Sequence, residues 1–433
     1  MRVAVIGAGI SGLACAWRLA QSDAAIETTL FEANRYFGGH ANTVDVTLDG
    51  ITHPVDTGFL VFNERTYPNL VALFEELEVP TTETDMSFSV SLADRALEWA
   101  GTNLNTVFAQ RLNLLRPSFL RMLADIVRFN RLATSMALAT RDEASAAESV
   151  GRFLEHERFS AAFRDGYLLP MIGAIWSCPV AQMMAFPIGT LVRFCHNHGL
   201  LQVADRPRWR TVTGGSREYV ARMLARIPDS RSSEAVRSVR RVVRDARPSV
   251  EIRTASGVET FDHAVLACHS DEALSMLADA STDECAMLGA IRFLPNRAVL
   301  HTDLSLLPAR RAWSAWNYES RSAKGETHVC VHYLINRLQP LPFKTPVIVS
   351  LNPVREPRRD RVLSEFAYSH PLFDRPAIDA QRALPALQGE RNTWFAGAWT
   401  GYGFHEDGLT SGLSAAASLI GRAAESERPE LVA

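Results

Sequence analysis

Three glycines near the N-terminus have the spacing of a phosphate-binding turn. Gly7, Gly9 and Gly12 form a G-x-G-x-x-G pattern directly after an apolar run at residues 3–6,. In such a turn the first glycine permits a sharp bend, the second lets the backbone approach a pyrophosphate, and the third lets a helix pack closely on a strand. Glu32 follows Gly12 by twenty residues, the offset expected of a carboxylate that binds ribose hydroxyls. The pattern therefore predicts a dinucleotide site.

The surrounding sequence predicts the elements that such a site needs. Residues 3–6 predict a strand, residues 13–19 carry apolar side chains at helical spacing, and residues 27–31 predict a second strand that ends at Glu32,. The N–H groups and the positive end of the dipole at the start of the helix would favour a pyrophosphate there. Because strand, turn, helix and acid agree, the dinucleotide interpretation is favoured over an ordinary glycine turn.

A second glycine-rich segment lies near the C-terminus. An apolar strand at residues 394–396 ends at Gly397 and leads through a glycine-rich loop to a helix predicted over residues 409–420. The start of this helix would also favour an anion, unless the helix only docks on a sheet. His405 and Glu406 are the titratable groups beside it and are candidate catalytic residues. The alternative is a loop pair held by backbone hydrogen bonds.

The composition is that of a globular protein with more than one domain. The chain has 433 residues, of which 47% are hydrophobic and 21% are charged, and this length favours two domains. The net charge of −3 gives no electrostatic basis for nucleic-acid binding,. No apolar stretch is long enough to span a membrane. Because the first strand begins at residue 3, we expect no cleavable signal and predict a cytoplasmic protein.

The cysteines and histidines lack the spacing of metal ligands. Six cysteines are scattered without a C-x-x-C pair, so buried free thiols are the favoured interpretation. His196 and His198 have no third ligand nearby, and no metal site is predicted,. Nearly all the basic residues are arginines, because Lys324 and Lys344 are the only lysines.

A helix-rich region is predicted between residues 86 and 205. Residues 111–131 combine apolar side chains at helical spacing with five arginines. Such a basic amphipathic segment can lie on a membrane surface, although a helix packed on the core with one solvated face is the favoured interpretation. The apolar and aromatic run at residues 167–179 is predicted either to line a hydrophobic substrate pocket or to pack in the core.

Strand patterns occur on both sides of this region. Alternating residues at 44–48 and 51–55 flank an Asp-Gly dipeptide and predict a β-hairpin,. Further strands are predicted within residues 236–267. Residues 275–385 are β-rich and are expected to form a sheet that covers the cofactor.

The chain resembles the flavin-containing amine oxidase and phytoene desaturase superfamily. The likeness rests on residues 3–40, 211–217 and 394–412, where the glycine turn and the ribose acid are followed by the pair Gly38-Gly39. In amine oxidases this pair is typically followed by arginine, whereas here it is followed by His40. The resemblance implies FAD as the cofactor. The residues expected to bind it are Gly7, Gly9, Ile10, Ser11, Gly12, Glu32, Ala33, Gly38, Gly39, His40, Thr57, Gly58, Gly397, Gly408, Leu409 and a valine near the adenine, either Val236 or Val239, of which Val239 is chosen.

The resemblance also implies the domain organisation. The expected fold is α/β, or α+β overall, with a Rossmann-like FAD-binding domain and a discontinuous helix-and-sheet substrate domain. The FAD-binding domain is predicted to comprise residues 1–85, 206–274 and 386–433. The substrate domain is predicted to comprise residues 86–205 and 275–385.

Some segments resemble one bacterial branch of the superfamily. Residues 54–63, 86–90 and 403–408 are similar to predicted NAD/FAD-binding proteins whose genes often lie beside fatty-acyl methyltransferases of the cyclopropane synthase type. The resemblance thus points to a hydrophobic or lipid substrate and a lipid methyltransferase partner. The basic segment at residues 111–131 adds the expectation of peripheral contact with the inner membrane face. Neither lysine stands in the context of the lysine that amine oxidases commonly use near the flavin.

These features predict an FAD-dependent oxidoreductase. The first hypothesis is hydride transfer to flavin N5 from an unsaturated or methyl-modified fatty acyl chain. Alternatives are an amine oxidase, for which Tyr333, Tyr402 and Phe404 are candidate cage residues,, and a flavin-dependent fatty-acid double-bond isomerase or desaturase. A further alternative is a non-catalytic FAD-binding partner of a lipid-modifying enzyme.

Overall fold

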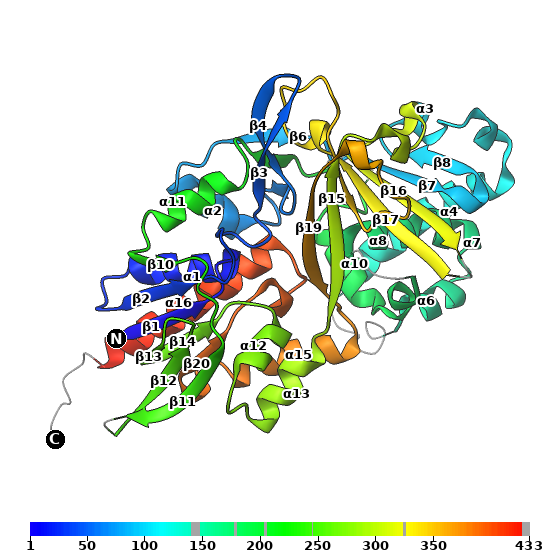
Figure 1. The fold of residues 1–433 in the computed structure, drawn as a ribbon. Helices are drawn as coiled ribbons and strands as arrows, with labels where there is room; N and C mark the ends of the chain where they lie inside the picture. The colour runs from blue at the N-terminus through cyan, green and yellow to red at the C-terminus, as the bar shows by residue number, and fades with distance from the viewer. Residues whose placement is uncertain (140–147, 177–179, 203–205, 245, 324–325, 427–433) are drawn as a thin grey trace.

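The computed structural model describes residues 1–139, 148–176, 180–202, 206–244, 246–323 and 326–426. A parallel sheet lies near both termini, and a larger sheet with most of the helices of the middle of the chain lies on the other side of the molecule (Figure 1). The fold is α/β with a Rossmann-like sheet and a mixed substrate-domain sheet, as predicted.

The parallel sheet is built around the first strand of the chain. All of its neighbouring strands pair in parallel, and its order is β10 (Asp229–Arg231), β2 (Glu27–Phe31), β1 (Arg2–Ile6), β14 (His263–Leu266) and β20 (Thr393–Phe395). Val3, Ala4 and Val5 are fully buried, because helices cover both faces of the sheet.

The helices on the two faces come from distant parts of the chain. One face packs against α1 (Ile10–Ala20), α2 (Pro68–Glu76), α11 (Arg217–Leu224) and α16 (His405–Ser426). The other packs against α12 (Ser270–Met276), α13 (Thr282–Ala290) and α15 (Arg375–Ala383). The same face carries a three-stranded antiparallel sheet of β11 (Ser238–Arg244), β12 (Arg247–Arg253) and β13 (Val258–Phe261).

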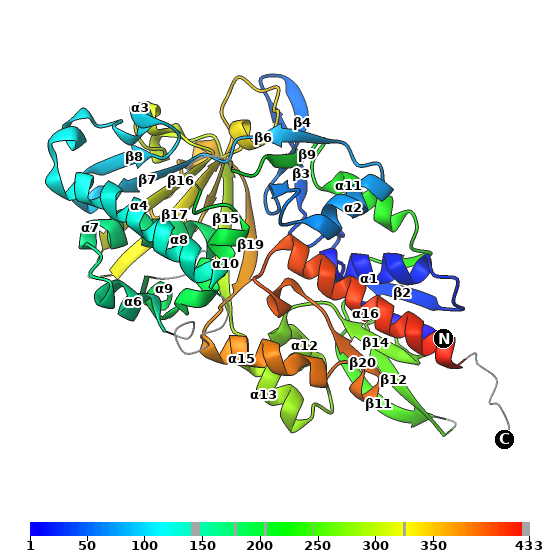
Figure 2. The same ribbon diagram turned by 180° about the vertical axis from the view of Figure 1, so that it is seen from behind.

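Helices α1 and α16 lie side by side (Figure 2) and approach each other at glycines. A Cβ added to Gly412 of α16 would overlap the carbonyl oxygen of Ser11 in α1. A Cβ added to Gly12 of α1 would overlap the carbonyl oxygen of Gly7 in the preceding turn. The close packing of turn, first helix and last helix therefore depends on residues without side chains.

The second domain is a seven-stranded mixed sheet. Its order is β19 (Val362–Pro371), β15 (Phe293–His301), β18 (Ile348–Leu351), β17 (Glu326–Leu334), β16 (Trp316–Ala323), β7 (Phe88–Leu92) and β8 (Leu97–Ala100). Only the β16–β7 pair is parallel.

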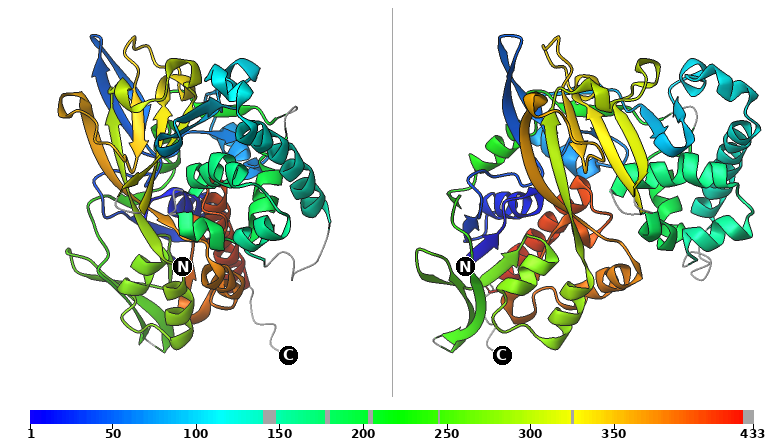
Figure 3. Two further views of the ribbon diagram at one scale, coloured as in Figure 1. Left: turned by 90° about the vertical axis from the view of Figure 1, so that its right-hand side faces the viewer. Right: turned by 45° about the vertical axis from the view of Figure 1, so that its right-hand side comes forward.

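Most of the remaining helices gather at the end of the molecule away from the parallel sheet (Figure 3). They are α3 (Leu104–Val107), α4 (Pro117–Leu138), α6 (Val150–His156), α7 (Ala161–Phe163), α8 (Leu169–Trp176), α9 (Val180–Ala185) and α10 (Ile188–Asn197). Helices α4 and α8 share a core with the sheet, so these helices and the sheet form one packed unit. The short α14 (Ile335–Leu338) follows β17.

Short strands connect the two domains. The predicted hairpin is present as β3 (Thr43–Leu48) and β4 (Ile51–Asp56), with the positive φ angles of 53° at Asp49 and 77° at Gly50 that a tight turn requires,. A three-stranded sheet comprises β5 (Phe62–Asn63), β9 (Trp209–Val212) and β6 (Thr81–Thr84).

The structure corrects three sequence-based expectations. The region 86–205 begins with two strands, β7 and β8, which join the large sheet through a distant partner, β16. Helix α16 begins at His405 and not at Leu409. Helices α13 and α15, which the predicted boundaries place in the substrate domain, pack on the parallel sheet instead. Each feature depends on long-range packing, for which the local sequence carries no signal.

Within the ranges that the structure describes, no helix is both long enough and apolar enough to cross a bilayer.

The glycine contact between α1 and α16 can be tested with two substitutions in one helix. We expect Gly412→Ala to lower the free energy of unfolding by about 1–3 kcal/mol, because the added methyl group overlaps the Ser11 carbonyl,. Gly421→Ala, whose Cβ would meet nothing within 4 Å, should instead raise it by up to about 1 kcal/mol through helix propensity. Urea denaturation measures both values, and equal effects of the two substitutions would contradict the proposed contact.

Candidate functional site

One large cavity connects the two domains. It has a volume of about 1420 Å³ and is lined by the β1–α1 turn at one end and by residues of α4, α8 and α10 at the other. Ligand pockets of single small molecules commonly occupy about 300–1,000 Å³. The cavity therefore has room for a cofactor together with a substrate.

The glycine turn has the geometry of a phosphate site. Gly7 has a φ of +97°, which favours glycine,, and the turn leads directly into α1 at Ile10. A Cβ added to Gly9 would meet nothing within 4 Å, so the peptide at Gly9 faces open space in the cavity wall. The first N–H groups of a helix have no partner within it, and an anion can bind there. These residues fit a pyrophosphate.

Glu32 stands at the end of β2, beside this turn. Its carboxylate accepts hydrogen bonds from the Ala8 N–H at 2.9 Å and from the Asn34 N–H at 2.8 Å. The side chain is buried but lines the cavity. The side-chain amide of Asn34 also donates to the Glu32 carboxylate at 3.0 Å. Because a carboxylate has about four acceptor sites, Glu32 retains the capacity for about one further hydrogen bond, such as one from a ribose hydroxyl.

The pair Gly38-Gly39 packs against the same turn. Both residues have positive φ, at 124° and 61°, and Gly38 forms a parallel bridge with Gly9. A Cβ added to Gly39 would lie 3.1 Å from the Gly9 Cα. This contact brings the following residue, His40, into the cavity.

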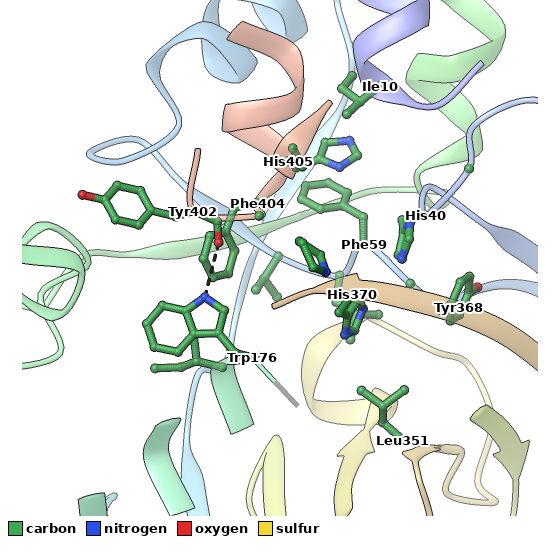
Figure 4. A pocket seen from close by; sticks show the side chains of 18 of the residues that line it. Ile10, His40, Phe59, Trp176, Leu351, Tyr368, His370, Tyr402, Phe404 and His405 are labelled. Carbon is green, nitrogen blue, oxygen red and sulfur yellow. Dashed lines mark hydrogen bonds between the residues drawn. The ribbon is translucent and has the colours of Figure 1, made fainter. Parts of the chain in front are cut away.

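His40, His370 and Tyr368 lie around the middle of the cavity (Figure 4), and His269 lies near them. The ring of His40 stacks on Tyr368 with centroids 4.9 Å apart and lies 5.5 Å from the ring of His370 and 6.5 Å from that of His269. Burial lowers the pKa of His40 to about 3 and that of His370 to about 4. The buried Nε2 of His40 has no hydrogen-bond partner. An unpaired buried nitrogen is costly, which favours a polar ligand group at this position.

His405 lines the same part of the cavity. Its ring stacks on Phe59 with centroids 3.9 Å apart, and its Nε2 forms a hydrogen bond of 2.6 Å with the Tyr219 hydroxyl. Burial lowers its pKa to about 3, so the imidazole is neutral at neutral pH. A group with so low a pKa is a weak proton acceptor at that pH, which favours a positioning role over acid–base chemistry.

Glu406 does not belong to the site, and the expectation that it is catalytic is corrected. Its carboxylate accepts hydrogen bonds from the N–H groups of Asn69 and Leu70 at 2.9 and 3.0 Å. These two residues are in the first turn of α2, so Glu406 caps the N-terminus of another helix. This is the structural alternative considered for the pair, and it holds for this residue.

Most of the residues expected to bind the cofactor line the cavity. Those that do are Gly7, Gly9, Ile10, Ser11, Glu32, Ala33, Gly38, Gly39, His40, Thr57, Gly58 and Gly397. Gly12 instead packs on the turn, and Gly408 packs on Ile10 and Ser11. Leu409 is buried in the core beneath α16.

The two candidate valines are separated by the structure. Val236 lines the cavity, whereas Val239 is fully buried in the core formed with α12. The choice of Val239 is therefore corrected to Val236. Val236 lies in the segment before β11, whereas Val239 lies within β11 and packs in the core with α12.

Apolar and aromatic side chains line the far end of the cavity. Trp176 of α8 donates a hydrogen bond from its ring N–H to the Tyr402 carbonyl at 3.3 Å, and the rings of Phe194 and Phe404 stack with centroids 4.9 Å apart (Figure 4). The run 167–179 was expected either to line a pocket or to pack in the core, and its residues divide between the cavity wall and the core. Tyr167, Met171, Ala174, Ile175 and Trp176 line the cavity, Leu168 and Ile172 pack in the core, and residues 177–179 lie outside the described ranges.

Among the described residues that line the cavity there is no lysine. The Lys344 backbone N–H binds the carboxylate of Asp49 at the tip of the β3–β4 hairpin. Lys324 lies outside the described ranges. Tyr333, Tyr402 and Phe404, the candidate cage residues, do line the cavity.

Sequence reasoning missed His269, His370 and Tyr368. His269 follows the end of β14, beside the glycine turn, and a general signal could have found it because ligands bind at the carboxyl ends of parallel strands,. Tyr368 and His370 lie near the end of β19, a strand of the other domain. Their position facing the cofactor end depends on how the domains pack.

A substitution at Gly9 should separate flavin binding from folding. We expect Gly9→Ala to leave the unfolding midpoint unchanged, because its Cβ meets no protein atom. It should nevertheless reduce the bound flavin by about tenfold, because the methyl group fills the approach to the pyrophosphate. The flavin-to-protein absorbance ratio measures this, with Gly421→Ala as the control. Full flavin content in Gly9→Ala would show that the pyrophosphate binds elsewhere.

The neutral histidines predict how stability depends on pH. His40, His370 and His405 have pKa values of about 3 to 4 in the folded protein and about 6.5 in an unfolded chain. Between these values only the unfolded state is protonated, so the free energy of unfolding should fall as pH decreases from about 6.5 to 5. His370→Gln should reduce this slope by up to about one proton, and the exposed His156→Gln should not. A slope that is unchanged in His370→Gln would contradict its burial in the neutral form.

Comparisons with known proteins agree with this architecture. The structure is similar to putrescine oxidase bound to putrescine, at 15% identity and a TM-score of 0.68 over 98% of this chain and 100% of the other. It is similar to cyclohexylamine oxidase from Brevibacterium oxydans, at 15% identity and a TM-score of 0.66 over 99% of both chains.

A third similar structure is the CLA-producing fatty acid isomerase from P. acnes, at 14% identity and a TM-score of 0.65 over 97% of this chain and 98% of the other. A comparison with curated protein sequences finds no significant match.

The family model of the flavin containing amine oxidoreductases matches residues 10–342, which is more than half of the chain. The fold, the glycine turn beside a ribose carboxylate and the enclosed cavity fit an oxidoreductase that holds a flavin. The chain therefore belongs to the flavin-containing amine oxidoreductase family.

Proposed function

We propose that the protein is an FAD-dependent oxidoreductase that acts on an apolar substrate, an unsaturated or methyl-modified fatty acyl chain. The observation that carries this proposal is the continuity of one cavity from the dinucleotide turn to a wall of apolar and aromatic side chains. A substrate bound against that wall can extend toward the cofactor within the same cavity. A passage with such an apolar end suits a long hydrocarbon.

The chemistry divides between the cofactor and the chain. Bound FAD supplies an acceptor for a hydride at its N5 atom. The chain holds the nucleotide through the glycine turn and Glu32, and it excludes water with the aromatic residues Trp176, Phe194 and Phe404. His40, His370 and His405, whose pKa values burial lowers, are neutral at neutral pH, which suits an uncharged reacting carbon.

The charges near the cavity also support an apolar substrate over an amine. A cationic amine is usually met by carboxylates or by an aromatic cage. Of the acids that line the cavity, Glu83 and Asp85 lie on β6 and in the segment after it, and their side chains are 65% and 39% exposed. They face water, whereas the residues at the apolar wall are buried or partly buried. The resemblance to a branch associated with fatty-acyl methyltransferases supports the same substrate class.

An amine oxidase is the second candidate. Family membership favours it, and so do Tyr402 and Phe404, which line the cavity as cage residues would. The absence of a lysine from the described lining residues disfavours it. A double-bond isomerase uses the same cavity and differs in that the hydride returns to the substrate, so that no external oxidant is consumed.

Bleaching of the flavin absorbance distinguishes these candidates. We expect anaerobic addition of a membrane lipid extract to bleach the bound flavin, and a panel of amines to leave it unchanged. Bleaching by an amine alone would replace the proposal with an amine oxidase. Conversion of a lipid without oxygen consumption would identify an isomerase.

A matched pair of substitutions tests whether the substrate binds at the apolar end of the cavity. Ile175→Trp narrows the apolar end of the cavity and should slow lipid-dependent bleaching by about tenfold while leaving flavin content unchanged. Ile51→Trp, at an exposed site in the β3–β4 hairpin, is the control. Equal rates in the two variants would show that the substrate binds outside the apolar end.

A further inference from the structure

Exposed apolar side chains are concentrated in one short part of the chain. Of the thirteen large apolar side chains that are exposed among the described residues, seven lie between residues 104 and 138. Leu104, Leu112 and Leu115 are 78%, 68% and 81% exposed. Single exposed apolar residues are ordinary, but a group of them on neighbouring elements marks an interaction surface.

Helix α4 presents three faces with three different surroundings. Met122, Phe129 and Ala133 are buried in the cores of the domain. Leu123, Ile126 and Asn130 line the cavity. The third face carries Leu120, Val127 and Leu138, which are exposed and which fall within about 20° of one another at 3.6 residues per turn. Arg131 falls on the same side of the helix, so this outer face combines exposed apolar side chains with a basic one, and no part of the described chain covers it,.

The same surface is strongly basic. Residues 101–138 contain five arginines and one acid, Asp125, which is buried and paired with Arg121 at 3.3 Å and Arg128 at 3.5 Å. A loop of the large sheet adds two exposed arginines, and Arg311 donates a hydrogen bond to the Ala109 carbonyl at 3.4 Å. Positive charge therefore borders the exposed leucines.

This basic apolar surface occupies the end of the molecule away from the parallel sheet (Figures 1 and 3). It is defined by Leu104, Leu112, Leu114, Leu115, Leu120, Val127 and Leu138 with Arg111, Arg116, Arg121, Arg131, Arg310 and Arg311. Thr102, Val107 and Leu123, which lie on or beside the same elements, line the cavity. The surface and the apolar end of the cavity thus share α3 and α4.

We infer that the basic apolar surface docks the protein on an anionic phospholipid bilayer. Apolar side chains beside arginines suit a layer of acyl chains beneath negative headgroups. A second copy of the chain fits less well, because a symmetric contact would place the arginines of one copy against those of the other. Docking brings the elements that line the apolar end of the cavity to the lipid, and it does so whichever reaction the flavin performs.

Vesicle binding by the flavin-loaded enzyme tests this inference. We expect the protein to sediment with vesicles of phosphatidylcholine and phosphatidylglycerol in equal parts, and to remain in solution with phosphatidylcholine alone. High salt should weaken the binding, because it screens the arginines. Failure to bind the mixed vesicles would overturn the inference and would leave the proposed reaction untouched.

Paired variants assign the binding to this surface. The double substitution Leu112→Ser and Leu115→Ser should lower the affinity for the mixed vesicles by about tenfold or more. The control is Val243→Ser with Val258→Ser, two exposed sites on the β11–β13 sheet. Equal loss in both pairs, or no loss in either, would overturn the assignment. So would a dimer in solution that dissociates only in the leucine variant, since a second copy would then cover the surface.

Discussion

The close approach of the β1–α1 turn, α1 and α16 is the constraint on which the site depends. Gly12 lies against the Gly7 carbonyl and Gly412 against the Ser11 carbonyl, at separations that exclude a side chain. This packing aims the start of α1 at the cavity. It also places the first turn of α16 beside Phe59, so that His405 faces the cavity while Glu406 caps α2. One set of backbone contacts therefore organises both ends of the chain around the flavin site.

The cavity joins two environments that a single domain does not provide. The parallel sheet contributes backbone N–H groups and a carboxylate, which suit a phosphate and a ribose. The large sheet and its helices contribute aromatic and aliphatic walls. Between them, burial lowers the pKa values of His40, His370 and His405, so that these imidazoles are neutral. This arrangement is consistent with membership of a flavin family and favours an apolar substrate.

Helix α4 connects the cavity with the outer surface. Its inner residues line the apolar end, and its outer residues form part of the basic apolar surface. The helix was expected either to lie on a membrane or to pack on the core. It packs on the core with one face and leaves other apolar residues exposed, because residues on different sides of a helix meet different surroundings,. Packing on the core and contact with a membrane surface are therefore compatible for this helix.

The sequence by itself determined the glycine turn, the position of Glu32 at the end of β2, the hairpin and the parallel sheet around β1. Each of these has a local requirement, such as a positive φ at Gly7 or a bare peptide at Gly9, that only certain residues at fixed spacing satisfy. The tertiary structure decided the rest. His370 reaches the cofactor end from β19, and Glu406 binds the N–H group of Asn69, which lies 337 residues earlier in the chain. Such contacts depend on the packing of whole domains, and the residues next to His370 and Glu406 in the sequence do not predict them.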